Sequence, residues 1–584
     1  MDKYISKIQG LMKSHNIDIY YLTTSDDHLS EYIPEHYRLI KFLTGFSGSL
    51  AKMLITQDKA YLWVDGRYHK QADQEVTSKL IEVMKEGKNG VKSIQEFLAD
   101  YHHQTLAFDG KLTSYKFISE FCETMNLVSI DLVSELYEDR PALIKEPIFE
   151  LDLKYTGVSR EAKIKAIKNI YQDNTLIVGN LEEIAYLLNL RGKDIKHTPV
   201  FRSFVIYTDN NLYLFIDYEK ISPELNDKLR NDNIILKEYD EYYRFLNTLT
   251  KQNIFIDLSK INYETIDNLH KSNHIHDEAS ALNMLKAIKN DVEIEGMKKA
   301  HLYDAVSLIR LYMWLDKIDL TTINELDVAK KLNSLRLEYK AFDLSFSSII
   351  AYNENAAMMH YNPENQIPKQ LDNQGILLMD SGGHYLEGTT DITRTIALGP
   401  ISDEIKKYYT LTLRSMFNLA DVKFIKCMNG QQLDILARMY LWKEGVDYRC
   451  GTGHGVGQTL SVHEAPPSIR FRDTIGGSEK IPFKKGMVVS DEPGVYFEGK
   501  YGIRLENLLY CDDYLSNEYG DFLCFKHLTF VPFDHKLIDL KYLDDETLKL
   551  LNEYHQACFD KVSPLLENEE EINYLRNITR SIKR

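Results

Sequence analysis

Residues 376–395 read ILLMDSGGHYLEGTTDITRT, and this stretch decides the fold of the chemically most informative part of the chain. Its apolar run predicts a buried strand that ends in a carboxylate, Asp380. Eleven residues later Asp391 opens a second predicted strand, so a hairpin would bring both carboxylates to the same end. Such a buried carboxylate is costly unless it is paired or holds a metal ion. By themselves the two aspartates also fit a turn with a salt bridge.

Three further stretches supply side chains of the same kind. The loop CGTGHGVG surrounds His454 with glycines, which let the backbone approach whatever the imidazole holds. It lacks the Lys-Ser/Thr pair of a phosphate-binding loop, so it does not indicate nucleotide binding. The segment MVVSDEPG predicts a strand that ends in Glu492. In GIRLEN, Arg504 and Glu506 lie two residues apart and therefore on one strand face.

Together these stretches offer four carboxylates and one imidazole: Asp380, Asp391, His454, Glu492 and Glu506. Oxygen-rich ligands of this kind suit two Mn-, Fe- or Co-like ions better than a structural zinc site, which prefers sulfur and nitrogen. Two ions about 3.5–4 Å apart can share a hydroxide that is nucleophilic at neutral pH. The set therefore predicts a hydrolase with two divalent metal ions.

The five ligand motifs, in this order, resemble those of the pita-bread metallopeptidases, the family of methionine aminopeptidase, prolidase and aminopeptidase P. The resemblance implies that Asp391 and Glu506 bridge both metal ions. Asp380 would complete one site, and His454 and Glu492 would complete the other. It also implies that Glu492 is catalytic as a proton shuttle. Because the ligand set is rich in oxygen, we expect the metal to be Mn²⁺, with Co²⁺, Fe²⁺ and Zn²⁺ as alternatives.

Further positions match family residues that lie near the substrate. His360 in MMHY and His463 in SVHE match catalytic histidines that contact the substrate and stabilise the oxyanion, although either alone would as readily be structural. Arg504 matches an arginine that orients the ligand carboxylates. Four residues before His454, where many relatives have a second histidine, this chain has Cys450. We expect Cys450 to line the substrate cleft without binding metal, with an inert buried thiol as the alternative.

Ahead of the catalytic part, two stretches repeat one plan. The apolar runs at residues 19–22 and 60–64 parallel those at residues 176–178 and 211–217. Helices that alternate with short apolar strands favour an α/β unit. The parallel therefore suggests a duplicated domain, with chance similarity of buried strands as the alternative.

The expected fold class is α/β and α+β, with two creatinase-like α/β domains and a pita-bread catalytic domain that carries a helical tail. The expected domains are residues 1–139, 140–283 and 284–584. The first boundary falls in the punctuated stretch RPALIKEP. Amphipathic helices are expected at residues 284–316 and 323–337, followed by strand-rich and glycine-rich sequence to about residue 533.

Bulk composition limits the function classes. At 584 residues the chain exceeds what one hydrophobic core usually organises. A formal net charge of -17 without a Lys/Arg-rich tract argues against nucleic acid as a partner. The sequence shows neither a leader pattern nor a bilayer-spanning apolar run, so no membrane association is expected. Six cysteines without CxxC spacing fit a reducing cytosol, and we expect a cytoplasmic protein.

Among these relatives the resemblance is to the three-domain cytosolic Xaa-Pro aminopeptidases. LTGFSGS and WVDGRY resemble their first domain, and LNLRG with HTPVF resembles their second. The resemblance implies cleavage before a penultimate proline in peptides, and a homodimer with Trp442 at the interface; a core tryptophan is the alternative. Prolidase action on Xaa-Pro dipeptides remains an alternative, because the metal ligands do not separate the two activities. A non-catalytic peptide-binding module is a third hypothesis.

Overall fold

The structure is a computed structural model, and it describes residues 2–474 and 476–584. The chain forms two compact units. One comprises Met1–Glu150 and Val158–Leu282, and the other comprises Leu151–Gly157 and Asn283–Arg584. None of the helices in the described residues is long and apolar enough to cross a membrane.

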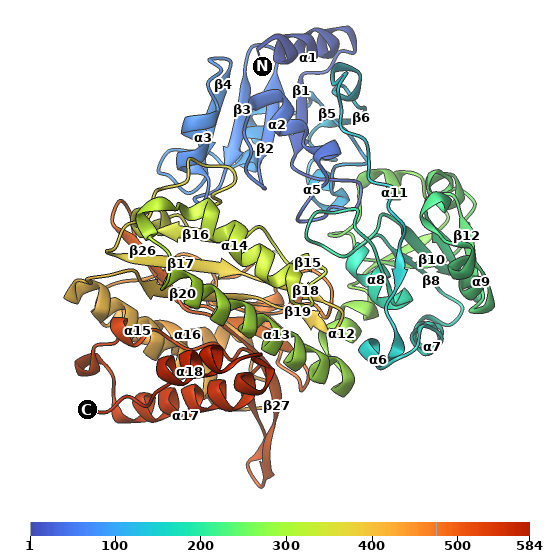
Figure 1. The fold of residues 1–584 in the computed structure, drawn as a ribbon. Coiled ribbons are helices and arrows are strands. Elements are labelled where there is room, and N and C mark those ends of the chain that lie inside the picture. The colour runs from blue at the N-terminus through green and yellow to red at the C-terminus, as the bar shows by residue number, and fades with distance from the viewer. Residues whose placement is uncertain (1, 475) are drawn as a thin grey trace. The chain divides into compact units, whose positions relative to one another are not determined.

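The first unit is built on two six-stranded sheets among its described residues (Figure 1). One has the order β4-β3-β2-β1-β5-β6 and the other β12-β11-β10-β8-β13-β14. The strands of the first are β1 (Ile19–Thr23), β2 (Lys52–Thr56), β3 (Ala60–Val64), β4 (Ile81–Lys85), β5 (Thr105–Phe108) and β6 (Asn126–Ser129). Those of the second are β8 (Thr175–Val178), β10 (Phe204–Thr208), β11 (Asn211–Phe215), β12 (Ile234–Lys237), β13 (Asn253–Ile256) and β14 (His274–Asp277).

The two sheets share one topology. In each, two successive antiparallel pairings join the first three strands, and the remaining pairings are parallel. β3 and β11, which hold two of the runs compared in the sequence, occupy equivalent positions. The duplicated α/β plan is therefore present in the fold. Both sheets belong to one compact unit, and the boundaries at residues 140 and 284 stay a proposal.

Helices cover these sheets. The longer ones are α1 (Asp2–Ser14), α3 (His69–Glu75), α7 (Arg160–Tyr171), α8 (Leu181–Leu188) and α9 (Pro223–Asn231), with shorter α2 (Leu39–Thr44), α4 (Ile94–Leu98), α5 (Tyr115–Ser119), α10 (Tyr242–Leu246) and α11 (Tyr263–Asp267). In α1, Ile5, Ile8 and Met12 recur at helical spacing and are fully buried. Burial of this stripe docks α1 against the first sheet's core.

The second unit opens with helices, but the single helix expected at residues 284–316 is wrong. The structure divides it into α12 (Ala281–Ala287) and α13 (Asp291–Leu315). Asn290 starts the second helix, because its side chain accepts from the backbone of Glu293 while Glu293 accepts from the backbone of Asn290. α14 (Glu325–Glu338) follows close to its expected position.

A three-stranded sheet contains β16 (Ile349–Tyr352), β17 (Ile376–Ser381) and β20 (Ile392–Ala397). Asp380 lies in β17, and Asp391 directly precedes β20. Leu377 and Met379 pack with α13 and α14 on one face. Ile376 packs with α15 (Asp403–Ala420) on the other, so Asp380 shares the face of Ile376. β17 and β20 pair antiparallel with Ser381 opposite Ile392. As predicted, Asp380 and Asp391 come to the same end.

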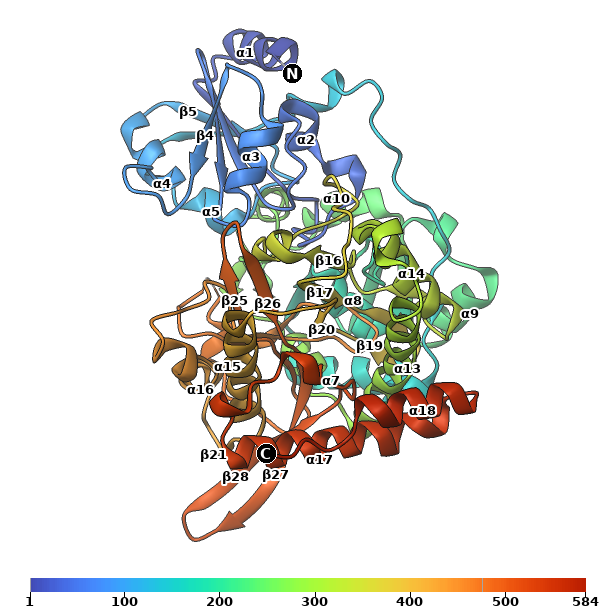
Figure 2. The ribbon, with the colours of Figure 1, turned by 60° about the vertical axis from the view of Figure 1, so that its left-hand side comes forward.

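A six-stranded sheet carries the other ligands and has the order β21-β28-β27-β24-β22-β23. Its strands are β21 (Lys423–Ile425), β22 (Gly453–Gly455), β23 (Glu464–Ile469), β24 (Val488–Asp491), β27 (Asn507–Asn517) and β28 (Gly520–His527), and β25 (Gly494–Phe497) pairs with β26 (Tyr501–Arg504). The stretch expected to be strand-rich also contains α15 and α16 (Gly430–Trp442), which the sequence analysis missed. α17 (Asp545–Val562) and α18 (Glu569–Ile578) form the expected helical tail (Figure 2).

Candidate metal centre

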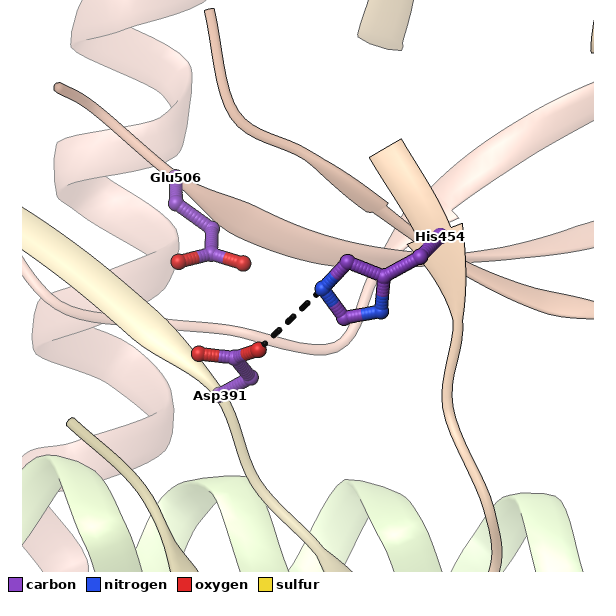
Figure 3. A group of neighbouring side chains, drawn as sticks. All are labelled: Asp391, His454 and Glu506. Carbon is purple, nitrogen blue, oxygen red and sulfur yellow. Dashed lines mark ion pairs between the residues drawn. The ribbon is translucent and has the colours of Figure 1, made fainter. Parts of the chain in front are cut away.

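The ends of strands in these two sheets bring the predicted ligands together. Asp380 lies in β17, Asp391 precedes β20, His454 lies in β22, Glu492 follows β24, and Glu506 precedes β27. Ligand atoms of Asp391, His454 and Glu506 all lie within 4.8 Å of one another (Figure 3). His454 Nε2 lies 3.5 Å from Asp391 Oδ2 and 3.3 Å from Glu492 Oε1.

His454 reaches this position because glycines flank it. A Cβ on Gly453 would overlap the carbonyl oxygen of Ser490 in β24, and one on Gly455 would overlap that of Glu464 in β23. Only a glycine backbone therefore fits between the two neighbouring strands. The sequence analysis had assigned these glycines to the approach of whatever the imidazole holds, whereas here they allow close packing of strands. The His454 backbone N–H also donates to Ser490 Oγ at 3.0 Å.

Arg504 links two of the carboxylates. Its Nη2 contacts Asp380 Oδ2, and its Nη1 donates to the hydroxyl of Tyr496 at 2.7 Å. Its Nε donates to Thr393 Oγ1 at 3.2 Å, and Thr393 in turn donates to Glu506 Oε2 at 2.8 Å. Arg504 therefore orients Asp380 directly and Glu506 through Thr393.

The chemistry of the cluster fits a cationic occupant. Three buried oxygens, Asp380 Oδ1, Asp391 Oδ1 and Glu506 Oε1, have no hydrogen-bond partner among the described residues. Burial, and then the neighbouring carboxylates, raise the pKa values of Asp391 and Glu506 well above their usual range. Burial raises the pKa of Glu492 to about 7, against the lowering effect of Arg504. Four crowded carboxylates and one imidazole are a donor set that divalent ions complete.

The structure brings one of the two predicted histidines to this cluster. The ring centroid of His463 lies 4.4 Å from that of His454, with an interplanar angle of 79°. His360 is exposed. It follows the short helix η7 (Asn353–Ala357), which packs against β26, the strand that ends in Arg504.

Cys450 is half-buried close to the ligands. Burial, and then the Glu492 carboxylate, raise the pKa of its thiol to about 11. The sequence analysis missed the residues that hold its loop. Buried Arg438 on α16 donates to Asp434 Oδ2 at 2.5 Å and to the carbonyl oxygen of Cys450 at 2.8 Å. Thr452 donates to Asp434 Oδ1 at 2.5 Å and accepts at its carbonyl from the backbone of Glu492 at 2.8 Å.

A second group that the sequence analysis missed lies beside His463. The next residue, Glu464, is buried and pairs with two buried lysines, Lys286 at 3.3 Å and Lys289. Burial lowers the pKa of Lys289, and the charge of Glu464 opposes that shift. Both lysines lie at the break between α12 and α13, so this break fixes the backbone next to His463.

Comparison with known families matches almost the whole chain. Residues 295–513 match metallopeptidase family M24, and residues 521–582 match the C-terminal region of that peptidase family. Residues 5–139 and 139–293 each match a creatinase/prolidase N-terminal domain.

Similar proteins extend over the same length. Aminopeptidase P2 of Arabidopsis thaliana is 35% identical, and the match covers 100% of this chain and 89% of that protein. Xaa-Pro aminopeptidase 1 of Dictyostelium discoideum is 33% identical, with 99% and 96% covered. The crystal structure of X-prolyl aminopeptidase from Caenorhabditis elegans, described as a cytosolic enzyme with a di-nuclear active site, superposes with a TM-score of 0.92 at 31% identity and covers 99% of both chains. Xaa-Pro dipeptidase from Bacillus anthracis covers only 64% of this chain, at 20% identity and a TM-score of 0.51.

Proposed function

Since the chain belongs to metallopeptidase family M24, we propose that it is an Xaa-Pro aminopeptidase, which hydrolyses the bond between an N-terminal residue and a penultimate proline. Its substrates would be peptides with proline at the second position. The observation that carries the proposal is the cluster of carboxylates around His454, whose buried oxygens Asp391 Oδ1 and Glu506 Oε1 have no hydrogen-bond partner among the described residues. The full-length match to an enzyme with a di-nuclear active site supports two metal ions.

Each residue of the cluster would have its own task. Asp391 and Glu506 would bridge the two ions, Asp380 would bind one, and His454 and Glu492 the other; we propose Mn²⁺. When bound, the ions supply a nucleophile derived from water and polarise the scissile carbonyl. The Glu492 carboxylate, which accepts from Ser490 Oγ at 3.0 Å, would take up the proton of the attacking water. It would then deliver that proton to the leaving proline nitrogen.

Hydrolysis of paired peptides tests the proposal. With Mn²⁺, an Xaa-Pro aminopeptidase releases the first residue of an Xaa-Pro-Xaa tripeptide, whereas a prolidase cleaves the Xaa-Pro dipeptide alone. Turnover of neither peptide would favour a non-catalytic peptide-binding module. The relatives named aminopeptidases match almost the entire chain, and the dipeptidase leaves about a third unmatched, which favours the tripeptide.

His463→Ala and His360→Ala are expected to lower turnover of the tripeptide while both metal ions stay bound. We assign these histidines to the substrate and the oxyanion, outside the ligand set. The ring of His463 lies beside that of the proposed ligand His454. We expect the carboxylates to keep their places when the His463 ring is removed. Metal content per chain and kcat, measured on the same preparations, check this. Loss of both ions from either variant would show that the assignment is wrong.

Cys450→Ala is expected to keep both metal ions and substantial activity, because the thiol is proposed to line the cleft without coordinating. Alkylation of the wild-type thiol should inhibit, and a Xaa-Pro product analogue should protect against it. Since burial raises the thiol pKa to about 11, alkylation at neutral pH should be slow and should accelerate as the pH rises. Fully active alkylated enzyme would remove Cys450 from the cleft.

We further propose a cytoplasmic homodimer. The Caenorhabditis elegans enzyme is described as cytosolic, which supports the location. Trp442 on α16 is not a core tryptophan, because 40% of it is exposed. Its Nε1 donates a hydrogen bond to Asp447 Oδ1 at 2.8 Å. A dimer is expected by sedimentation at micromolar concentration, with Trp442→Ala weakening it. A monomeric wild-type protein at that concentration would contradict the dimer.

A further inference from the structure

A buried carboxylate outside the metal centre organises one long connection in the second unit. Glu325, the first residue of α14, is fully buried. Its Oε1 accepts from the backbone N–H of Tyr352 at 2.6 Å and from Asn355 Nδ2 at 3.0 Å. Its Oε2 accepts from the hydroxyl of Tyr361 at 2.5 Å and from the backbone N–H of Lys369 at 2.6 Å. Three of these donors belong to the connection between β16 and β17, and Tyr352 is the residue of β16 from which that connection starts.

These donors span the beginning, the middle and the end of that connection. Tyr352 ends β16, and Tyr361 directly follows His360. Near the far end, the Lys369 carbonyl accepts from the backbone of Glu325 at 3.1 Å. One carboxylate thus closes a long surface segment onto the first turn of α14, which lies beside β16 (Figure 1).

The charge of Glu325 is balanced without an ion pair among the described residues. The ammonium of Lys369 pairs instead with exposed Glu354, at 2.5 Å. The N-terminus of α14 carries a partial positive charge that favours a carboxylate, and hydrogen bonds to an ionised acceptor are stronger than neutral ones. A buried charge that is held by donors from the end of β16 and from the connection ties these residues firmly to α14. Each broken hydrogen bond would leave a buried acceptor without a partner, which costs its desolvation penalty.

The same connection lies against the site. A Cβ on Gly502 would overlap the carbonyl oxygen of Ala356, so the two backbones approach as closely as they can. Gly502 lies on β26, two residues before Arg504. On its other side, Tyr361 packs in a buried cluster with Leu378 of β17, two residues before Asp380. The connection is therefore packed on both sides of His360. Ala356 packs against β26, which carries Arg504, and Tyr361 packs against β17, which carries Asp380.

We propose that Glu325 is a positioning residue: it gathers the connection between β16 and β17 and so holds His360 where that histidine acts on the substrate. The inference rests on the proposed function, which assigns His360 to the substrate. The hydrogen bonds of Glu325 to the described residues include none to the five proposed metal ligands, so its effect would pass through the backbone on either side of His360.

Glu325→Gln is the direct test, because it keeps the side-chain volume but presents an NH₂ group to a ring of donors. The expected result is a fall in kcat on an Xaa-Pro-Xaa peptide of about 10- to 100-fold, the range for loss of supporting contacts. Both metal ions should stay bound, and amide exchange at residues 353–369 should accelerate. Glu354→Gln removes a charge from the same connection but at an exposed position, and its kcat should stay within about twofold of wild type.

A double-mutant cycle separates positioning from a general loss of structure. In a His360→Ala background, Glu325→Gln should lower kcat little further, because coupled residues are non-additive. An equal loss in both backgrounds, or an unchanged kcat in Glu325→Gln, would overturn the proposal. If Glu325→Gln does not fold, Tyr361→Phe removes one donor and keeps the ring in the core, with a smaller loss expected only when His360 is present.

Failure of the proposed function gives a different result. It would leave the wild-type protein inactive toward both peptides. Amide exchange at residues 353–369 in Glu325→Gln would still decide whether the carboxylate holds the connection, and unchanged protection there would overturn the inference.

Discussion

Glu492→Gln is expected to lower kcat about 10²–10⁴-fold, the range typical of losing a general base. Glutamine keeps the size of the side chain and an oxygen that can accept from Ser490 Oγ, but it cannot take up a proton. It is also a weaker metal ligand than a carboxylate, so part of the loss can come from the ions. Metal content per chain, measured with kcat, separates the two effects.

The control for Glu492→Gln is Glu498→Gln, which removes the same charge from an exposed turn between β25 and β26. Its kcat is expected to match wild type. A Glu492→Gln enzyme that retains both ions and loses less than about tenfold in kcat would exclude Glu492 as the proton shuttle.

Strand patterns were the part of the fold that the sequence could predict. Asp380 in β17 and Asp391 just before β20 come to the same end because the two strands pair antiparallel. That pairing was predictable, since each strand is a local apolar run with a carboxylate at one end. The break at Asn290 was missed although its capping signal, Asn290 with Glu293, is local. Apolar residues continue on both sides of it, and they concealed the cap.

α15 was missed for a different reason. Its buried face mixes hydroxyl side chains with apolar ones. Thr410 and Thr412 satisfy their hydroxyls by donating at 2.8 Å to the carbonyls of Lys406 and Tyr408, one turn earlier. Such back-bonding removes the cost of burying them, and the sequence pattern does not reveal it.

Candidate ligands and Arg504 were predictable, but the other residues that support the site were not. Each ligand sits in a short motif with glycine or apolar neighbours. In contrast, Lys289 pairs with Glu464 and Glu325 accepts from Tyr361 only after distant segments have folded together. A glutamate in the first turn of a helix is common, because the partial positive charge at the helix N-terminus stabilises its carboxylate. Nothing in the sequence therefore distinguished Glu325.

Chelation of the divalent ions is expected to abolish hydrolysis, and Mn²⁺ is expected to restore it with two ions bound per chain. The cluster places Asp391 and Glu506 side by side with buried oxygens that have no partner among the described residues. A cation relieves that arrangement, so the metal-loaded protein should also melt at a higher temperature than the chelated protein. Full activity after exhaustive chelation, with metal content verified as negligible, would refute a metal-dependent mechanism.

The variant that matches chelation is Asp391→Asn, which keeps the side-chain shape but removes the charge of a proposed bridging ligand. It should lose bound metal and activity together, and added Mn²⁺ should not restore either.

The pH dependence of metal binding provides a second check. Burial and crowding raise the pKa values of Asp391 and Glu506, so protons compete with the ions and binding releases protons. Mn²⁺ affinity, measured by calorimetry, should therefore weaken as the pH falls. At one pH, calorimetry in buffers of different ionisation enthalpy should show protons released on binding. An affinity independent of pH would show that these carboxylates are not the ligands.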